Sequence, residues 1–229
     1  MKGQFMRVLA SKLLPLGRIQ MEKSTVERLD VDELLQLALQ ASKENRNEQS
    51  ITYLKRALDL KPREGRLHYM LAAEHAQMGL YDRAAEEMAK AVELDPSLVT
   101  AYFQLGLLHL TSGRVAQAES AWRPLDKLGP DHFLHLFKTG MLHLARDEFK
   151  ECKSCLERGI KANNFNEALN VDMRRVLHDV QERLGKPQPG AAAGAEPIIR
   201  PSIRPSGRAV LSAYRENRGD DEGDKKKKK

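Results

Sequence analysis

The sequence predicts an all-α fold: an α-α superhelix, or solenoid, of about four helical hairpins closed by a C-terminal capping helix. Pro62, Pro96 and Pro130 recur at one constant interval, and a fixed period of roughly 20–50 residues in helix-forming sequence indicates stacked hairpins. Ala, Leu, Glu, Lys and Arg dominate the middle of the chain, which also favours helices. No apolar run approaches the roughly 20 residues that a membrane-spanning helix needs, so no transmembrane segment is predicted.

Divided at the interval of these prolines, the repeat domain covers residues 31–184. It consists of four units and one capping helix, with these bounds: 31–64, 65–98, 99–132 and 133–166 for the units, and 167–184 for the capping helix. Residues 1–30 are predicted to form a basic, partly disordered extension. Residues 185–229 are predicted to form a disordered linker and a basic tail, because their composition is charged and of low complexity.

Each unit is expected to form two helices joined by a turn. The first helices carry apolar or amphipathic residues at helical spacing, such as Tyr102, Leu105 and His109 in the third unit. The turns have residue types that tolerate the backbone angles of a turn: Asn45, Gly79, Gly113 and Asp147. The second helices repeat a small residue and, four positions later, a large one, which lets neighbouring helices approach closely: Ser50 and Leu54, Ala84 and Met88, Ala118 and Trp122, Cys152 and Leu156.

The third unit resembles the tetratricopeptide repeat family. The family pattern places Trp or Leu, Leu-Gly, Tyr, Ala, Phe or Tyr, Ala and Pro at fixed offsets within a unit of this length. The matching residues here are Tyr102, Leu105, Gly106, Gly113, Ala118, Trp122 and Pro130. With the capping helix, the resemblance covers about two-thirds of the chain. It implies stacked helical hairpins and a role in binding rather than in catalysis.

Two positions depart from the family pattern. Asn164 stands where the fourth unit should have a proline. Pro124 lies inside the second helix of the third unit, where a proline removes a hydrogen bond and costs up to ~3 kcal/mol. The sequence therefore predicts that this helix kinks or ends early.

The segment 167–184 has an apolar stripe on one side of a helix, formed by Leu169, Met173, Val176, Leu177 and Val180. A terminal repeat needs an outer helix that is apolar inside and polar outside. The segment is therefore predicted to cap the array, and Gly185 followed by Pro187 ends it.

Charge separates the two ends from the middle of the chain. Residues 1–20 carry a net charge of +4 and the tail from Pro187 carries +4, which leaves −2 for residues 21–186 out of the total of +6. A nucleic-acid-binding domain should carry its basic patch on the folded body, so the repeats are not expected to bind nucleic acid. Three interpretations of residues 1–20 stay open: a dispensable extension, an import presequence or a surface-binding helix. Translation from Met21 would omit them.

The candidate catalytic and metal-binding residues are better explained by packing. His75, His109 and His143 recur at one repeat position, but equivalent residues of stacked hairpins lie roughly 8–10 Å apart, whereas zinc ligands lie about 2 Å from one ion. Cys152 and Cys155 lie inside a predicted helix without a preceding strand, unlike redox Cys-x-x-Cys motifs. We therefore predict no enzyme, metal, cofactor or small-molecule substrate. Two cysteines alone fit a reducing, cytoplasmic location.

In the tetratricopeptide family, the second, fifth, ninth, twelfth and thirteenth residues of each unit line the concave surface. The resemblance thus assigns a peptide-binding groove to Tyr69, Phe103, Leu107, Leu110, Phe137, Met141 and Leu144, with Phe103 and Phe137 as the anchors. The Lys and Asn of a carboxylate clamp are replaced by Leu35 and Leu39. So much apolar surface is rarely exposed without purpose. The alternatives to a partner peptide are that the capping helix covers part of the wall, or that residues 197–215 of the tail dock in it.

The sequence therefore predicts a non-catalytic protein–protein interaction module or scaffold that binds an apolar peptide or helix in its concave groove. Two alternatives stay open. One is a chaperone or assembly subunit of a bacterial secretion or surface-complex system, which would form homo-oligomers. The other is an adaptor that binds nucleic acid or a membrane surface through its basic tails, although the five lysines 225–229 alone give weak, salt-sensitive contact. The partner is not identified by the sequence.

Overall fold

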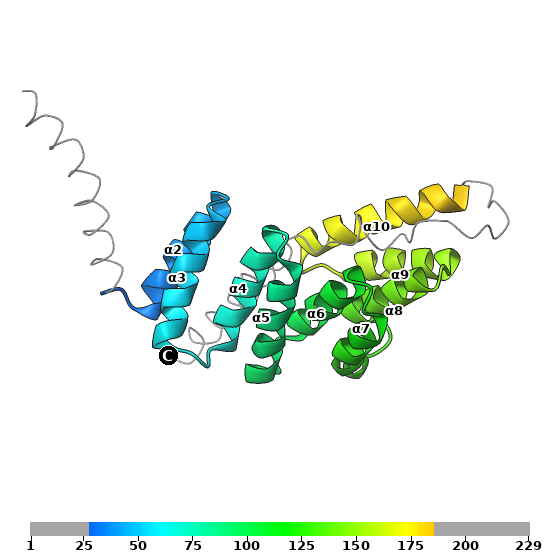
Figure 1. The fold of residues 1–229 in the computed structure, drawn as a ribbon. Helices are drawn as coiled ribbons and strands as arrows, with labels where there is room; N and C mark the ends of the chain where they lie inside the picture. Colours follow the sequence, from blue (N-terminus) through cyan, green and yellow to red (C-terminus); the bar gives the residue numbers. More distant parts are fainter. Residues whose placement is uncertain (1–27, 186–229) are drawn as a thin grey trace, which may run out of the picture. The chain divides into compact units, whose positions relative to one another are not determined.

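The computed structural model describes residues 28–185. The chain divides after Pro62 into two compact units, of which the first contains helices α2 and α3 and the second contains helices α4 to α10 (Figure 1). The predicted extension up to residue 27, the linker, the basic tail and the docking segment 197–215 lie outside the described residues.

The first unit is a helical hairpin of α2 (Val31–Lys43) and α3 (Asn47–Leu60). A capping box begins α2: the Asp30 side chain accepts the backbone N–H of Glu33 at 2.9 Å, and the Glu33 carboxylate accepts the backbone N–H of Asp30 at 2.9 Å. The core of this hairpin consists of small and aliphatic side chains that are at most 1% exposed: Leu34, Ala38, Ala41, Leu54 and Ala57.

The second unit contains three more hairpins and a final helix. Their bounds are α4 (Gly65–Gln77), α5 (Tyr81–Leu94), α6 (Val99–Thr111), α7 (Val115–Trp122), α8 (Phe133–Ala145), α9 (Phe149–Ala162) and α10 (Glu167–Gly185). The first helix of each of the four hairpins is 13 residues long. These helices begin at the same constant interval as the prolines, and the all-α repeat fold predicted from the proline spacing is confirmed.

The turns inside the hairpins use the residues that the sequence indicated. Asn45, Gly79, Gly113 and Asp147 all have a positive φ, between 57° and 76°. This left-handed conformation places Cβ close to the following carbonyl oxygen in most residue types. Glycine avoids the clash, and Asn and Asp tolerate it because their short side chains can hydrogen-bond locally.

The turn at Gly113 gives a direct test of this backbone requirement. An added Cβ would meet no atom within 4 Å, so a substitution there changes strain and not packing. We expect Gly113→Ala to lower the free energy of unfolding by about 1–2 kcal/mol. Gly113→Asn should cost less, because Asn45 adopts the same conformation with φ 57°. Urea denaturation of the two variants is the measurement, and equal losses would contradict the explanation.

Pro124 ends the second helix of the third hairpin, as predicted. α7 stops at Trp122, and Arg123–Leu128 continue as a 3₁₀ helix, η1, with the proline near its start. Leu125 of η1 is fully buried. Lys138 of α8 forms an ion pair with Asp126 of η1, and the lysine side chain is only 9% exposed. The 3₁₀ segment that follows the shortened helix is therefore packed against the next hairpin.

The alternation of small and large residues in the second helices is part of the core. All eight side chains of the pattern are at most 1% exposed: Ser50, Leu54, Ala84, Met88, Ala118, Trp122, Cys152 and Leu156. In residues 28–185, no helix combines the length and apolar character needed to cross a lipid bilayer.

Candidate binding groove

The residues assigned to the groove are buried in this structure. Tyr69 lies in α4 and is 3% exposed. The other six, which lie in α6 and α8, are at most 1% exposed: Phe103, Leu107, Leu110, Phe137, Met141 and Leu144. In the described structure these side chains therefore do not form an open wall. No peptide can reach these side chains while the surrounding helices keep their present positions.

Helix α10 packs against the last hairpin. Its buried residues Leu169, Met173, Val176 and Val180 belong to the same continuous core as the six groove residues of α6 and α8. α10 lies alongside α9 (Figure 1). Leu177, the fifth residue of the predicted apolar stripe, is half-buried and packs against the margin of this core. The apolar stripe of α10 is therefore buried mainly beside α9.

The aromatic residues at the centre of this core are structural. The rings of Phe103 and Trp122 stack with centroids 5.9 Å apart, and the rings of Phe103 and Phe137 lie 6.1 Å apart. Trp122 Nε1–H donates a hydrogen bond to the backbone oxygen of Phe103 at 2.9 Å. Replacing a buried phenylalanine by alanine typically costs about 3–5 kcal/mol. Replacing Phe103 or Phe137 by alanine would therefore lower the free energy of unfolding, and such a variant could not test partner binding.

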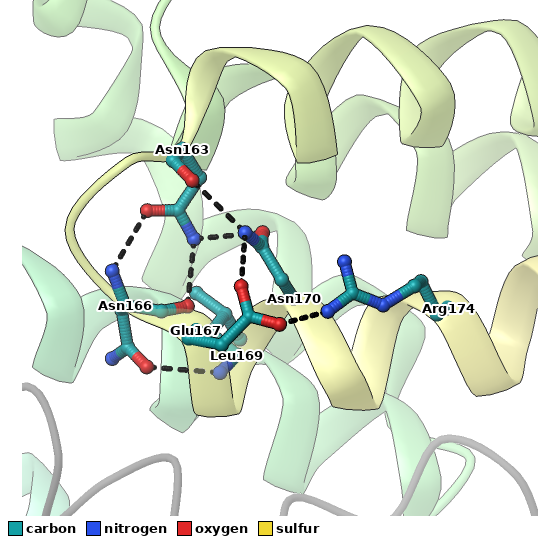
Figure 2. A network of polar contacts seen from close by, with 6 residues as sticks. All are labelled: Asn163, Asn166, Glu167, Leu169, Asn170 and Arg174. Carbon is teal, nitrogen blue, oxygen red and sulfur yellow. Dashed lines mark hydrogen bonds and ion pairs between the residues drawn. The ribbon is translucent and has the colours of Figure 1, made fainter.

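Three buried asparagines join α9 to α10 (Figure 2). Asn163, Asn166 and Asn170 are each at most 4% exposed. Asn163 Nδ2 donates to the backbone oxygen of Asn166 at 3.0 Å and to Asn170 Oδ1 at 2.9 Å. Asn163 Oδ1 accepts the backbone N–H groups of Phe165 and Asn166, at 3.2 and 3.0 Å. One side chain thus fixes the whole connection between the two helices.

The same network fixes the first turn of α10. Asn166 Oδ1 accepts the backbone N–H of Leu169 at 2.9 Å, which satisfies a free donor at the helix start. Asn170 Nδ2 donates to Glu167 Oε2 at 3.3 Å, and Glu167 forms an ion pair with Arg174. The sequence analysis missed this cap. An asparagine three residues before an apolar helical stripe is a start signal that could have revealed it.

The two cysteines have the properties of packed thiols. Burial, and secondly the neighbouring Cys155, raises the pKa of Cys152 to about 12. Burial also raises the pKa of Cys155 above its ordinary value. The thiolate is the nucleophilic form of cysteine, so both groups are protonated and weakly reactive at neutral pH.

The repeated histidines have separate surroundings. Burial, together with the nearby charge of Arg114, lowers the pKa of His109, whereas His143 Nδ1 lies 2.5 Å from Glu148 Oε2. Within residues 28–185, no group of three or more His, Cys, Asp or Glu side chains is arranged to hold a metal ion. These histidines are accordingly part of the packing of their own hairpins.

His132 caps α8 and makes stability depend on pH. Its Nδ1 accepts the backbone N–H of Leu134 at 3.2 Å, which requires an unprotonated Nδ1. Burial, and secondly the charge of His135, lowers the pKa of His132 below its ordinary value of 6.5. The unfolded chain then binds the proton more tightly than the folded one, so the contribution of this group is present above pH 6.5 and declines as the pH falls below it.

We therefore expect the free energy of unfolding to decline between pH 7 and pH 5, with a smaller decline in His132→Asn. Asparagine keeps an acceptor for the N–H of Leu134 and does not titrate. Urea denaturation across this range compares the two proteins, and the difference between them isolates His132 from the other histidines. An identical decline in both would contradict this role.

Comparison with known proteins finds one matching family model. Residues 35–99 match the model of the tetratricopeptide repeat, the segment that runs from α2 to the start of α6. The predicted resemblance to tetratricopeptide repeats is therefore confirmed over these residues. No curated protein matches the sequence.

Solved structures of tetratricopeptide repeat proteins share the fold. A thermophilic TPR protein of Thermus thermophilus, TTC0263, is 20% identical, with a TM-score of 0.55 over 68% of this chain and 83% of that one. MamA of Desulfovibrio magneticus RS-1 is 12% identical, with a TM-score of 0.52 over 82% of this chain and 96% of that one. A chain of the APC/C hetero-tetramer Cut9-Hcn1 is 15% identical, with a TM-score of 0.60 over 86% of this chain and 35% of that one.

Proposed function

We propose that this tetratricopeptide repeat protein is a non-catalytic scaffold that binds an apolar helix or extended segment of a protein partner in its concave groove. Arrays of such repeats are in general modules for protein–protein interaction, because stacked hairpins create an extended concave surface. Tetratricopeptide repeats in general support protein–protein interaction. We propose in addition that this chain uses its concave groove for it.

The observation that carries the proposal is the match of residues 35–99 to the tetratricopeptide repeat. The first helices of the four hairpins are all 13 residues long, and stacked repeats of this kind form an extended concave binding surface. Because Phe103 and Phe137 are fully buried, a partner would contact the exposed side chains beside them.

One similar structure is consistent with a scaffold. The chain of Cut9-Hcn1 belongs to a hetero-tetramer, so that repeat array was solved with a second kind of protein. At 15% identity the likeness extends to the fold and does not select a partner. The partner class for this chain, a segment that offers apolar side chains at helical spacing, is therefore part of the proposal.

The test is affinity capture with quantitative mass spectrometry, followed by direct binding of each purified candidate. Arg66 and Thr100 stand at the second position of their units, which the family places on the groove side, and they are exposed and half-buried respectively. Arg66→Glu combined with Thr100→Glu should weaken binding at least ~10-fold, about 1.4 kcal/mol. Arg83→Glu, an exposed position of the second helix α5, is the matched control.

The outcomes separate the alternatives. Equal losses in the groove-side variant and the control, or no loss in either, would count against the groove. Binding that disappears at higher salt and after removal of residues 186–229 would favour the adaptor that acts through its basic tail, because such contacts are screened.

A further inference from the structure

We propose that the first turn of α8 is released by acid: protonation of His132 detaches this turn, while the rest of α8 stays on η1. The proposal does not depend on the proposed function. It rests on two neighbouring attachments of α8, of which one loses its hydrogen bond when it is protonated and the other keeps its charges.

The first attachment is the cap of α8. His132 Nδ1 accepts the backbone N–H of Leu134 at 3.2 Å. A protonated imidazole carries a proton on both ring nitrogens and accepts no hydrogen bond, so the N–H of Leu134 would then face another donor. The new positive charge would also lie at the amino-terminal end of α8, where the helix dipole disfavours it. Protonation therefore removes the cap and also repels the first turn.

The second attachment keeps its charges in the same pH range. Lys138 of α8 pairs with Asp126 of η1, and the lysine side chain is only 9% exposed. Histidine changes its charge between pH 5 and 8, whereas lysine and aspartate are already charged there. Leu136 and Phe137, which follow the first turn, are buried in the core. The rest of α8 should therefore keep its place when the first turn is released.

An aromatic side chain moves together with the cap. The rings of His132 and Phe133 stack with centroids 4.6 Å apart, and Phe133 meets the edge of Phe137 at 6.0 Å. Phe133 is half-buried, so release of the first turn exposes more of its ring at the start of the fourth hairpin. A partner that contacts this ring would then bind in a pH-dependent way.

The charged groups around His132 come from several elements. His135 of α8 lies one turn further on, and its charge is the second cause, after burial, of the lowered pKa of His132. His135 Nδ1 lies 3.6 Å from Asp126 Oδ1 of η1, and Arg158 of α9 pairs with Asp131 at 2.7 Å. Further ionisable side chains of η1, α9, α6 and α7 are exposed or face the turns of the hairpins: Arg123, Lys127, Lys161, His109 and Glu119. Removing the charge of His135 should therefore raise the pKa of His132.

The test is hydrogen exchange of the full chain, followed by NMR between pH 7 and pH 5 and expressed as protection relative to the intrinsic exchange rate at each pH. The protection of the Leu134 amide should fall about tenfold for each pH unit below the pKa of His132. The amides of Phe137 and Met141, in the same helix, should change less than ~3-fold because the opening is local.

Three variants identify the group that is protonated. His132→Asn should abolish the fall at Leu134, because asparagine keeps an acceptor and does not titrate. His143→Asn, at the opposite end of α8, is the matched control and should keep the wild-type profile. His135→Gln should move the fall to higher pH, since it removes a charge that lowers the pKa of His132.

The outcomes decide the proposal. Constant protection of Leu134 in the wild type, or a fall that persists in His132→Asn, would overturn it. An equal fall at Phe137 would also overturn it, because acid would then act on the core and not on the first turn. Trp122, the one tryptophan of the chain, checks the last point: its fluorescence should stay constant over this pH range.

Discussion

Gly106→Ala is expected to lower the free energy of unfolding by about 3 kcal/mol, even though alanine favours a helix over glycine by about 1 kcal/mol. A Cβ at position 106 would lie 2.0 Å from Trp122 Nε1 and 2.2 Å from Trp122 Cε2. The indole must then move. That movement breaks its hydrogen bond to the backbone oxygen of Phe103 and disturbs the stacked Phe103 ring, so overpacking and a lost buried hydrogen bond act together.

The fourth repeat supplies the matched control for this change. Gly140 occupies the equivalent position, and its added Cβ would lie 3.1 Å from Leu156 Cδ2, the end of a flexible side chain. Gly140→Ala should therefore cost less than about 1 kcal/mol after the gain in helix propensity. Urea denaturation of both variants measures the difference. Equal costs would show that the indole does not determine the need for glycine.

The second repeat indicates how the defect can be repaired. It has Ala72 and Met88, both buried, where the third repeat has Gly106 and Trp122. Gly106→Ala combined with Trp122→Met should therefore be more stable than the sum of the two single changes predicts, by about 1–2 kcal/mol of interaction energy. Strict additivity would contradict the view that the two positions are matched in size.

The fold was predictable because each repeat is determined by local chemistry. A proline at a constant interval and a turn residue that tolerates a positive φ define where helices start and stop, without reference to distant parts of the chain. Asn45 and Asp147 show this well: they replace glycine in the first and fourth turns and adopt the same left-handed backbone. Pro124 likewise ends α7 by itself, because proline lacks the backbone N–H that a helix needs.

The state of the groove was not predictable by the same means. Repeat positions indicate which side of a helix Phe103 and Phe137 occupy, but they do not indicate what covers that side. The apolar stripe of α10 was recognised, and Phe103 and Phe137 were assigned to a groove. Their meeting in one core depends on the direction in which α10 leaves α9. The hydrogen bonds of Asn163 and Asn166 set that direction. Asn164, which stands where the repeat pattern has a proline, is exposed.

Asn163→Ala should lower the free energy of unfolding by about 3 kcal/mol, because each buried polar group left without a partner costs about 1–3 kcal/mol. The change leaves the backbone N–H groups of Phe165 and Asn166 without the acceptor that they have now, and it removes the donor to Asn170. Asn163→Asp should cost less, because it keeps the acceptor for both N–H groups and loses only the donors.

Asn164→Ala is the control in the same loop, since Asn164 is exposed and its replacement should stay within about 0.5 kcal/mol of the wild type. Urea denaturation gives the costs, and hydrogen exchange locates them. In Asn163→Ala the amides of α10 should lose protection more than those of α8, because the network attaches α10 to the end of α9. Uniform loss of protection would mean that the asparagines stabilise the repeats as a whole. Loss confined to α10 would show that the asparagines hold this helix against α9.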